Sequence, residues 1–341
     1  CFLVFALLTT RGTSILFISG FKFVHGISIY PGSLIRHEAL EYIFMKNHVF
    51  SGFSVAVVTP FNSDFSIDKE SYANHLHFLL DNGVDHLVIS GTTGESPSFS
   101  DDEFVYLVKT AVDITKAKGK GDVIAGSGSN DTEKTIRKSK LAEEAGATGL
   151  LMVTPYYNKP MQKALIAHFT AIADAVSIPI MLYNVPGRTN VNMLPETTLA
   201  LSKHKNIVAI KEASNDLQQI MKVIELVPSD FAVFSGDDAL TLPIIAAGGA
   251  GLVSVVGNEI PKLTADYVNT CLSGDFEAAR KLHYRLQPLM AFNFVETNPI
   301  PVKAALSLMG RMKNVLRLPL IPMDKKYEAQ LEAYLSDLGA M

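Results

Sequence analysis

Eight short apolar runs recur along the chain, and each is followed by a longer stretch with the spacing of an amphipathic helix. Each run has four to six β-prone residues and ends in Gly, Pro, Ser, Thr or Asn, which is typical of a parallel strand buried on both faces. The runs begin at Ser54, His86, Asp122, Gly149, Pro179, Ile207, Phe231 and Gly251. This α/β alternation predicts a closed (β/α)8 TIM barrel rather than an open doubly wound sheet.

The segments between the runs carry helix start and stop signals. Asp131 is predicted to cap the helix that begins after it. Glycines stand where three helices should give way to the next strand, at Gly83, Gly146 and Gly248. Beyond the eighth run, helical patterns continue to the end of the chain without a low-complexity linker. We therefore predict a barrel over residues 45–274, followed by a C-terminal helical region packed with it over residues 275–341.

Residues 1–44 do not follow this pattern. Their two apolar runs are interrupted by Arg11 and Lys22, and neither reaches the ~20 residues that a membrane-spanning helix needs. No small-residue cleavage site follows a charged region, and the first methionine is Met45, where MKNHVFSGFSVAVVTPF is typical of a protein start. We expect residues 1–44 to be upstream translated sequence outside the family pattern. A targeting segment, such as a plastid transit peptide, and a membrane attachment are the alternatives.

The composition excludes several classes of protein. A chain that is 48% hydrophobic with a net charge of -4 can bury enough apolar surface to fold, which excludes a disordered protein. Lys and Arg number 30 against 34 Asp and Glu, so no cationic excess is present for binding nucleic acid. Cys1 and Cys271 are the only cysteines, which excludes a disulfide framework and a Cys-rich zinc site.

Catalytic residues of such a barrel lie at the carboxyl ends of its strands. Lys211 ends one run, and burial there would lower its pKa and free the amine to attack a carbonyl; a solvated lysine is the alternative. Tyr183 ends the preceding run and could shuttle protons for that amine, or be a core tyrosine. Arg188 follows in a Pro-Gly loop, where it could bind a carboxylate or form a surface salt bridge.

The remaining polar groups give weaker signals. The Gly91–Gly94 turn could cradle an anion with its backbone N–H groups. Asp237 and Asp238 are predicted to be helix-capping acids rather than metal ligands. His75 and His77 face opposite sides of a helix, so they form no i, i+4 pair, and we predict no metal site. No P-loop, Gly-x-Ser-x-Gly elbow or Gly-x-Gly-x-x-Gly motif is present in the sequence.

Six motifs occur in order along the chain. They are GTTGES at 91–96, VTPYYNKP at 153–160, YNVPGRT at 183–189, IKEAS at 210–214, SGDD at 235–238 and NPIPVK at 298–303. This set resembles the dihydrodipicolinate synthase (4-hydroxy-tetrahydrodipicolinate synthase) family, from about Phe50 to the C-terminus. The wider superfamily includes N-acetylneuraminate lyase and other 2-keto-acid aldolases, class I enzymes that form a Schiff base with pyruvate or a pyruvoyl group.

The resemblance implies catalytic roles for four residues. Lys211 matches the Schiff-base lysine, and Tyr183 matches the proton donor and acceptor. Thr92 and Tyr157 match a relay that links Tyr183 to solvent, and Tyr157 is contributed by the neighbouring subunit of a homotetramer. The resemblance implies no cofactor and no metal, because the protonated imine on Lys211 is itself the electron sink.

Four further positions match substrate-binding residues of the family. Thr93 and Val253 match the positions that hold pyruvate, and Gly236 matches a backbone contact near the imine. Arg188 matches the residue that receives the carboxylate of L-aspartate-4-semialdehyde. Because sialic acid lyases usually lack Arg-Thr after the Tyr-Asn turn, the intact motif favours the lysine-biosynthetic condensation. We expect the enzyme to be cytoplasmic. Another aldolase or dehydratase of the superfamily and a non-catalytic keto-acid-binding barrel are the alternatives.

Feedback-inhibited members of the family bind lysine at a subunit interface near the active site. Three residues match that pattern: Ser96, Asn130 and Tyr156. Asp101 and Phe104 stand where sensitive bacterial enzymes often have histidine, and Lys134 replaces the usual acid. Since a lysine side chain would repel the ammonium of the inhibitor, we predict weak or absent inhibition by lysine.

Overall fold

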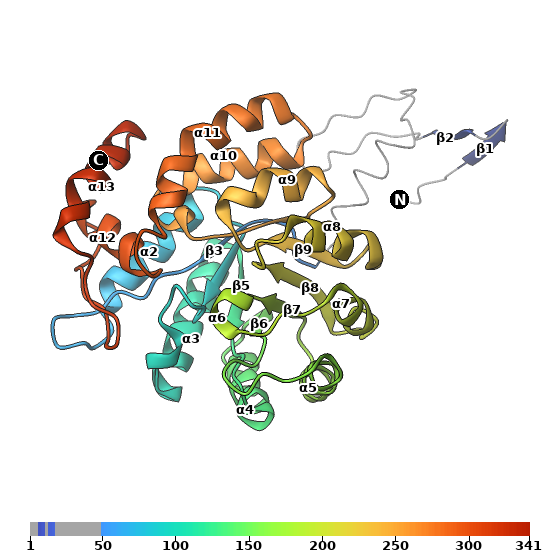
Figure 1. The fold of residues 1–341 in the computed structure, drawn as a ribbon, viewed down its shortest axis with the longest axis horizontal. Helices are drawn as coiled ribbons and strands as arrows, with labels where there is room; N and C mark the ends of the chain where they lie inside the picture. The colour runs from blue at the N-terminus through green and yellow to red at the C-terminus, as the bar shows by residue number, and fades with distance from the viewer. Residues whose placement is uncertain (1–5, 11–12, 18–48) are drawn as a thin grey trace. The chain divides into compact units, whose positions relative to one another are not determined.

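In the computed structural model, eight parallel strands close into a barrel surrounded by helices (Figure 1). The strands are β3 (Gly52–Ala56), β4 (His86–Ile89), β5 (Asp122–Gly126), β6 (Gly149–Val153), β7 (Ile180–Asn184), β8 (Ile207–Glu212), β9 (Ala232–Ser235) and β10 (Gly251–Ser254). Each strand pairs with the next along the chain, and β10 pairs with β3 to close the sheet. The predicted TIM barrel is confirmed, and the eight predicted runs supply its strands.

Helices lie between the strands, and the signals predicted at Asp131, Gly83, Gly146 and Gly248 stand at or directly after helix ends. The helices are α2 (Lys69–Asp81), α3 (Asp101–Lys118), α4 (Thr132–Glu144), α5 (Gln162–Ala175), α6 (Pro186–Thr189), α7 (Pro195–Leu201), α8 (Leu217–Leu226), α9 (Thr241–Ala246) and α10 (Pro261–Leu272). Asp131 caps α4, since its carboxylate accepts a hydrogen bond from the backbone N–H of Lys134 at 2.8 Å. Gly146 follows α4 with a φ of 90°, a left-handed conformation that favours glycine.

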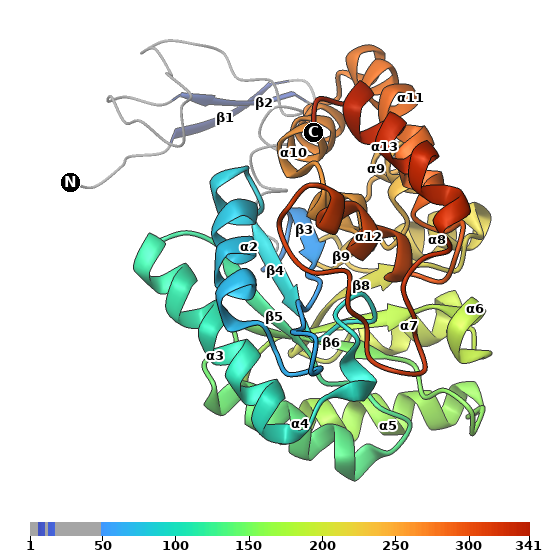
Figure 2. The same cartoon turned by 90° about the vertical axis from the view of Figure 1, so that its left-hand side faces the viewer.

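Three further helices form the C-terminal region. They are α11 (Phe276–Phe292), α12 (Ile300–Leu308) and α13 (Glu328–Asp337). α11 packs against α10 and α13, and α12 packs against α13, as the red and orange helices of Figure 2 show. The predicted helical region after the barrel is therefore confirmed.

The structure describes residues 6–10, 13–17 and 49–341. The chain divides into two compact units, Cys1–His48 and Val49–Met341. In the first unit, β1 (Ala6–Thr10) and β2 (Thr13–Phe17) pair antiparallel. The prediction for residues 1–44 falls mostly on residues 1–5, 11–12 and 18–44, which lie outside the described part of the chain.

The barrel has an apolar interior and an apolar outer layer, and strand alternation decides which residues belong to each. On β8, Ala209 belongs to the interior cluster, whereas Ile210 packs in the outer cluster beneath the helices. Because successive side chains of a strand point to opposite faces, Lys211 shares the interior face with Ala209. On β7, Met181 and Tyr183 belong to the same interior cluster. The fold therefore directs Lys211 and Tyr183 toward the inside of the barrel.

Candidate active site

Lys211 and Tyr183 are direct neighbours at the carboxyl ends of β8 and β7. The two residues are paired in the register of these strands, and the Lys211 Nζ lies 4.5 Å from the centre of the Tyr183 ring. Lys211 is only 5% exposed and Tyr183 6%. The amine that the sequence singled out is therefore a buried group inside the barrel, and the alternative of a solvated lysine is wrong.

Burial is the main influence on the Lys211 amine. It lowers the pKa of Lys211 to about 8, because a buried ammonium loses its hydration. The negative charge of Asp238 opposes this shift and the positive charge of Arg188 reinforces it. A substantially larger fraction of the amine is thus neutral near pH 7 than for a lysine in water, which is the form that attacks a carbonyl.

The Tyr183 phenol is held in its protonated form. Burial raises the pKa of Tyr183, while the charge of Arg188 and a hydrogen bond with Thr92 act in the opposite direction. A neutral phenol beside a neutral amine can donate a proton to an oxygen that leaves the reacting carbon. The contact with Thr92 joins Tyr183 to the turn that follows β4.

Asp238 departs from its predicted role. Asp237 does cap the short helical turn after it, because its carboxylate accepts from the Ala239 N–H at 2.8 Å. Asp238 is instead buried and accepts hydrogen bonds from the Ser254 hydroxyl and, at 2.9 Å, from the Val255 N–H. The prediction that Asp238 is a helix cap is therefore wrong, because its carboxylate turns toward the loop after β10.

Asp238 is also a functional candidate that sequence reasoning missed. Burial raises the pKa of its carboxyl to about 6, although its hydrogen bonds oppose the shift. Its negative charge raises the pKa of the Lys211 amine and so opposes the effect of burial. Asp237 and Asp238 are adjacent acids of the SGDD motif. Nothing in the sequence indicates that the first caps a helical turn and the second is buried near a lysine.

Because Gly236 has no side chain, it leaves room for the side chain of Lys211. Its N–H donates to the Glu212 carbonyl at 2.6 Å, which brings its backbone against β8. A Cβ at this position would lie 3.0 Å from the Lys211 Cε and 2.8 Å from the Glu212 carbonyl oxygen. Val253 is fully buried in the same interior cluster. Both predicted positions therefore lie within the barrel, and Gly236 directly borders Lys211.

Thr93 and Arg188 are linked through one residue of the C-terminal region. The Asn298 side-chain amide donates to the Thr93 hydroxyl oxygen at 3.0 Å, and the Asn298 carbonyl accepts from Arg188 Nη2 at 3.3 Å. Thr93 and Asn298 are buried, whereas Arg188 is exposed. Since the Thr93 oxygen already accepts a hydrogen bond, its own proton remains available for a ligand. Asn298 begins the NPIPVK motif, and nothing in the sequence pattern indicates this linking role.

A buried ion pair holds the turn that carries Thr92 and Thr93. Lys303 Nζ lies 2.7 Å from Glu95 Oε1 and also donates to the Thr59 carbonyl at 2.9 Å. The other Glu95 oxygen accepts from the Arg317 N–H at 3.0 Å. These contacts are not predictable from the sequence, because 208 positions separate Glu95 from Lys303 and no local pattern connects them.

A cavity of about 630 Å³ opens at this end of the barrel. Thr92, Tyr183 and Arg188 line it, together with Ser96 and Tyr156. The structure thus brings three of the predicted site residues to one cavity and places Lys211 directly beside one of them.

Tyr157 is not among the residues that line this cavity. It is 88% exposed on the single chain, with a φ of 73°. The predicted relay from Thr92 to Tyr157 is therefore not formed within one chain. The contact between Thr92 and Tyr183, in contrast, is present in the single chain.

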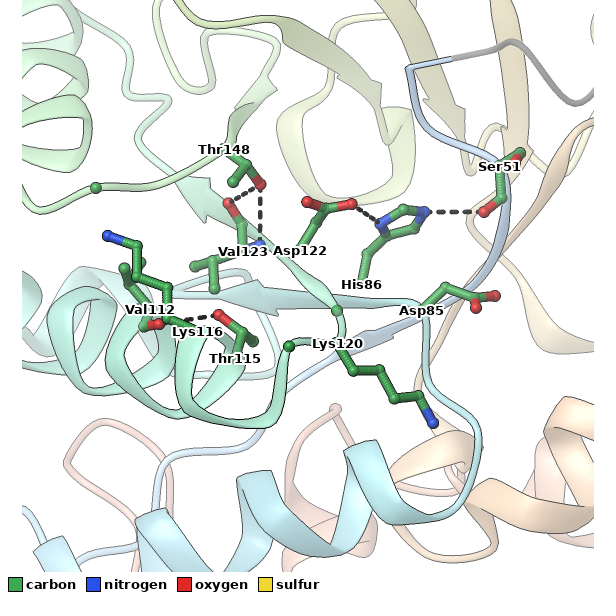
Figure 3. Close-up of a pocket in the computed structure, with 13 residues that line it drawn as sticks. Ser51, Asp85, His86, Val112, Thr115, Lys116, Lys120, Asp122, Val123 and Thr148 are labelled. Carbon is green, nitrogen blue, oxygen red and sulfur yellow. Dashed lines mark hydrogen bonds and ion pairs between the residues drawn. The ribbon is translucent and has the colours of Figure 1, made fainter. Parts of the chain in front are cut away.

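A second cavity, of about 540 Å³, lies at the opposite ends of the strands (Figure 3). Its wall includes His86 and Asp122, which are the first residues of β4 and β5. His86 Nδ1 lies 3.3 Å from the Asp122 carboxylate, and Nε2 lies 2.8 Å from the Ser51 carbonyl, as Figure 3 shows. Because barrel enzymes place their chemistry at the carboxyl ends, we assign this cavity a structural role.

Two kinds of site are absent from residues 6–10, 13–17 and 49–341. No cluster of three or more His, Cys, Asp or Glu side chains there could hold a metal ion. No helix in the same described ranges is long and apolar enough to cross a membrane.

Comparison with known proteins agrees with this geometry. Residues 49–338 match the model of the dihydrodipicolinate synthetase family. The 4-hydroxy-tetrahydrodipicolinate synthase of Geobacter sulfurreducens is 48% identical over 289 residues, which cover 85% of this chain and 99% of that protein. The enzyme of the same name from Methanocaldococcus jannaschii is 47% identical over 292 residues, covering 85% and 99%.

Solved structures show the same likeness. Dihydrodipicolinate synthase from Thermotoga maritima superposes with a TM-score of 0.84 at 46% identity, covering 86% of this chain and all of that one. The Cyanidioschyzon merolae enzyme, solved with lysine bound, gives a TM-score of 0.83 at 40% identity, covering 86% of this chain and 100% of that one. With its barrel, its buried lysine and tyrosine, and these matches over most of its length, the chain belongs to the dihydrodipicolinate synthetase family.

Proposed function

We propose that the protein is a lyase of the class I aldolase type that condenses pyruvate with L-aspartate-4-semialdehyde to give 4-hydroxy-tetrahydrodipicolinate, in lysine biosynthesis through diaminopimelate. One observation carries the proposal: the buried Lys211 amine lies 4.5 Å from the Tyr183 ring at the carboxyl end of the barrel. Membership of the family supports the choice of reaction, since the relatives described above bear the name of this synthase.

The reaction begins with the neutral Lys211 amine. Its nitrogen attacks the keto carbon of pyruvate, and the keto oxygen takes up protons and leaves as water, which yields a protonated imine. Tyr183 supplies a proton to the departing oxygen. The lowered pKa of Lys211 and the raised pKa of Tyr183 favour these two protonation states. No cofactor enters the proposal, because the imine carries the electron-withdrawing charge.

The imine then makes a methyl proton of the bound pyruvate removable, which gives an enamine. The enamine carbon attacks the aldehyde carbon of the second substrate, and the aldehyde oxygen becomes a hydroxyl. The amino group of that substrate finally attacks the imine carbon, and Lys211 leaves as a free amine when the ring closes. Gly236, Val253 and Thr93 border the pyruvoyl group in this scheme, and the free Thr93 proton donates to its carboxylate.

Arg188 selects the second substrate in this proposal. Its guanidinium lines the cavity, and within residues 49–341 its one side-chain hydrogen bond goes to the Asn298 carbonyl. The remaining N–H groups suit a bidentate contact with the carboxylate of aspartate semialdehyde. A sugar aldehyde, as in N-acetylneuraminate lyase, offers no such partner to Arg188.

The proton relay requires a second subunit. Thr92 hydrogen-bonds Tyr183, and we propose that Tyr157 of a neighbouring copy completes the path to solvent in a homotetramer. An aromatic side chain that is 88% exposed on the single chain is suited to such an interface. Sedimentation of the purified protein tests the assembly, and cell fractionation tests the cytoplasmic location that the family implies.

Borohydride reduction in the presence of pyruvate tests the mechanism. We expect an irreversible adduct on the peptide that contains Lys211, identified by mass spectrometry, and no adduct in the Lys211→Arg variant. Absence of the adduct would overturn the aldolase proposal and favour a non-catalytic keto-acid-binding barrel. Assays with aspartate semialdehyde, N-acetylneuraminate and sugar keto acids then identify the substrate, and turnover of only the latter two would reject the synthase.

A further inference from the structure

The pairing of β7 with β8 is irregular near the start of the two strands. Ile180 of β7 pairs with Ile207 of β8. The next residue of β7, Met181, pairs with Ala209, so that Val208 is an extra residue of β8 and forms a β-bulge. Val208 and Ala209 are successive residues, yet both pack in the interior cluster, as expected at a bulge.

The bulge decides which way Lys211 faces. Regular pairing from Ile207 onward would bring Ile210 opposite Tyr183, and it would bring Lys211 opposite Asn184. Because side chains alternate along a strand, a shift of one residue exchanges the two faces. Regular pairing would therefore turn Lys211 outward, toward the helices. In the observed register, Lys211 faces Tyr183 inside the barrel.

One hydrogen bond joins the ends of the two strands in the observed register. Asn184 is the residue after Tyr183 on β7. Glu212 is the residue after Lys211 on β8, and it pairs with Asn184. Asn184 Nδ2 donates to Glu212 Oε1 at 2.8 Å, and both side chains are fully buried. A shift of one residue would move Glu212 to the inner face and break this bond.

Further hydrogen bonds fix both partners. Asn184 Oδ1 accepts from the Met193 N–H at 2.9 Å, and Asn184 Nδ2 also donates to Asn192 Oδ1 at 2.9 Å. The second Glu212 oxygen accepts from the Ser214 N–H at 3.3 Å. Asn184 therefore connects the segment after β7, which includes the arginine of the YNVPGRT motif, to the end of β8.

The Glu212 carboxylate is specific for this arrangement. Its two oxygens meet two donors, the Asn184 amide and the Ser214 N–H. Burial raises the pKa of Glu212, and the hydrogen bonds from Ser214 and Asn184 oppose this shift. Glutamine at position 212 would have the same size, but its amide N–H2 would face one of the two donors. A buried donor without an acceptor is costly, so the register depends on the carboxylate.

We propose that Asn184 and Glu212 are positioning residues, whose hydrogen bond selects the bulged register and so holds Lys211 inside the barrel, opposite Tyr183. Val208 accommodates the extra residue that this register requires. The inference rests on the proposed function for the role of Lys211, whereas the register itself is measurable without turnover.

Competitive acetylation with acetic anhydride reports the environment of Lys211, because only the neutral amine reacts and mass spectrometry resolves the peptide. In the wild type we expect labelling to follow a pKa of about 8. In Glu212→Gln we expect the midpoint to shift to higher pH, toward the value of about 10.4 for a lysine in water. We also expect kcat of the condensation to fall about tenfold, as for loss of one hydrogen bond to a charged group. KM for pyruvate should change less, because molecules in the observed register remain intact.

Two further variants separate the register from general stability. Glu259→Gln is the matched control, since Glu259 is buried and accepts from the Asn293 amide at 2.8 Å, outside β7 and β8. We expect a comparable loss of stability in urea and an unchanged midpoint for Lys211. Deletion of Val208 from Glu212→Gln removes the extra residue, so that regular pairing turns Lys211 inward, and we expect the low midpoint to return.

A folded Glu212→Gln protein with the midpoint and kcat of the wild type would overturn the proposal. An equal shift of the midpoint in Glu259→Gln would overturn it as well. Asn184→Ser removes the donor from the other strand, and it provides the same measurement if Glu212→Gln does not fold. Acetylation needs no pyruvate, so failure of the borohydride experiment leaves its result interpretable.

Discussion

Glu95 and Lys303 form a buried ion pair between the loop after β4 and helix α12, with Oε1 and Nζ 2.7 Å apart. Both side chains are almost fully excluded from solvent. The pair fixes the C-terminal region to the turn that carries Thr92 and Thr93. The position of that turn therefore depends on residues outside the barrel.

We expect Lys303→Met to destabilise the protein by about 3–5 kcal/mol, because it leaves the Glu95 carboxylate buried without its partner. The double change Lys303→Met with Glu95→Gln should recover part of this loss. Urea unfolding provides the measurement, and Lys281→Met, which breaks an exposed pair with Glu277, is the control with a change below about 1 kcal/mol. Equal effects of Lys303→Met and Lys281→Met would contradict the prediction.

The pH dependence of pyruvate use should follow the Lys211 amine. Its pKa is lowered to about 8, and only the neutral form attacks the carbonyl. We expect kcat/KM for pyruvate to rise about tenfold per pH unit below pH 8 and to level off above it, since kcat/KM reports the free enzyme. A rise that continues to about pH 10, the range of an unperturbed lysine, would show that burial does not control the amine.

Lys211 should also reduce the stability of the fold. Its pKa is about 8 in the folded protein and about 10.4 when unfolded, so the folded state binds the proton less tightly. Below pH 8 the full cost applies, on the order of 3 kcal/mol, and it disappears as pH rises toward the unfolded value. We expect Lys211→Met to raise the melting temperature at pH 7 and to have a smaller effect near pH 10. Thermal scans of both proteins at both pH values test this, and an unchanged or lower melting temperature at pH 7 would refute it.

Gly236→Ala should disturb the site through crowding. The added Cβ would lie 3.0 Å from the Lys211 Cε and 2.8 Å from a backbone oxygen that cannot move easily. We expect a fall in kcat of about 100-fold, the effect of displacing a reacting group by roughly 1 Å. The control is Gly187→Ala, where no atom lies within 4 Å of the added Cβ. Steady-state assays of both variants check the prediction, and equal activities would argue against it.

Lysine should be a weak inhibitor. Ser96, Tyr156 and Lys134 line one cavity, so the predicted acid-to-lysine difference occurs where an inhibitor ammonium would approach. We expect the Lys134→Glu variant to be more sensitive to L-lysine than wild type in a coupled assay. Inhibition of the wild type at micromolar lysine would contradict the prediction.

The strands were predictable because each is buried on both faces, which produces an uninterrupted apolar run. The run from Ile207 also placed Lys211 correctly, since strand alternation decides the face of its last residue. Asp238 was not predictable in the same way, because a helix-capping acid and a buried acid look alike beside Asp237.

Long-range contacts explain the other omissions. Glu95 meets Lys303 and Arg317 only after the whole barrel has closed, and no spacing in the sequence encodes that meeting. Asn298 likewise joins Thr93 to Arg188 from outside the barrel. The role of Tyr157 stays a prediction, since its partners would belong to another subunit.

The contacts of Glu95 also have a consequence for the order of synthesis. A growing chain completes β10 at Ser254, well before the ribosome adds Lys303 and Arg317. A nascent polypeptide can therefore hold every strand of the barrel while the turn with Thr92 lacks its final supports. Completion of the turn that carries Thr92 therefore requires residues that are synthesised after the whole barrel.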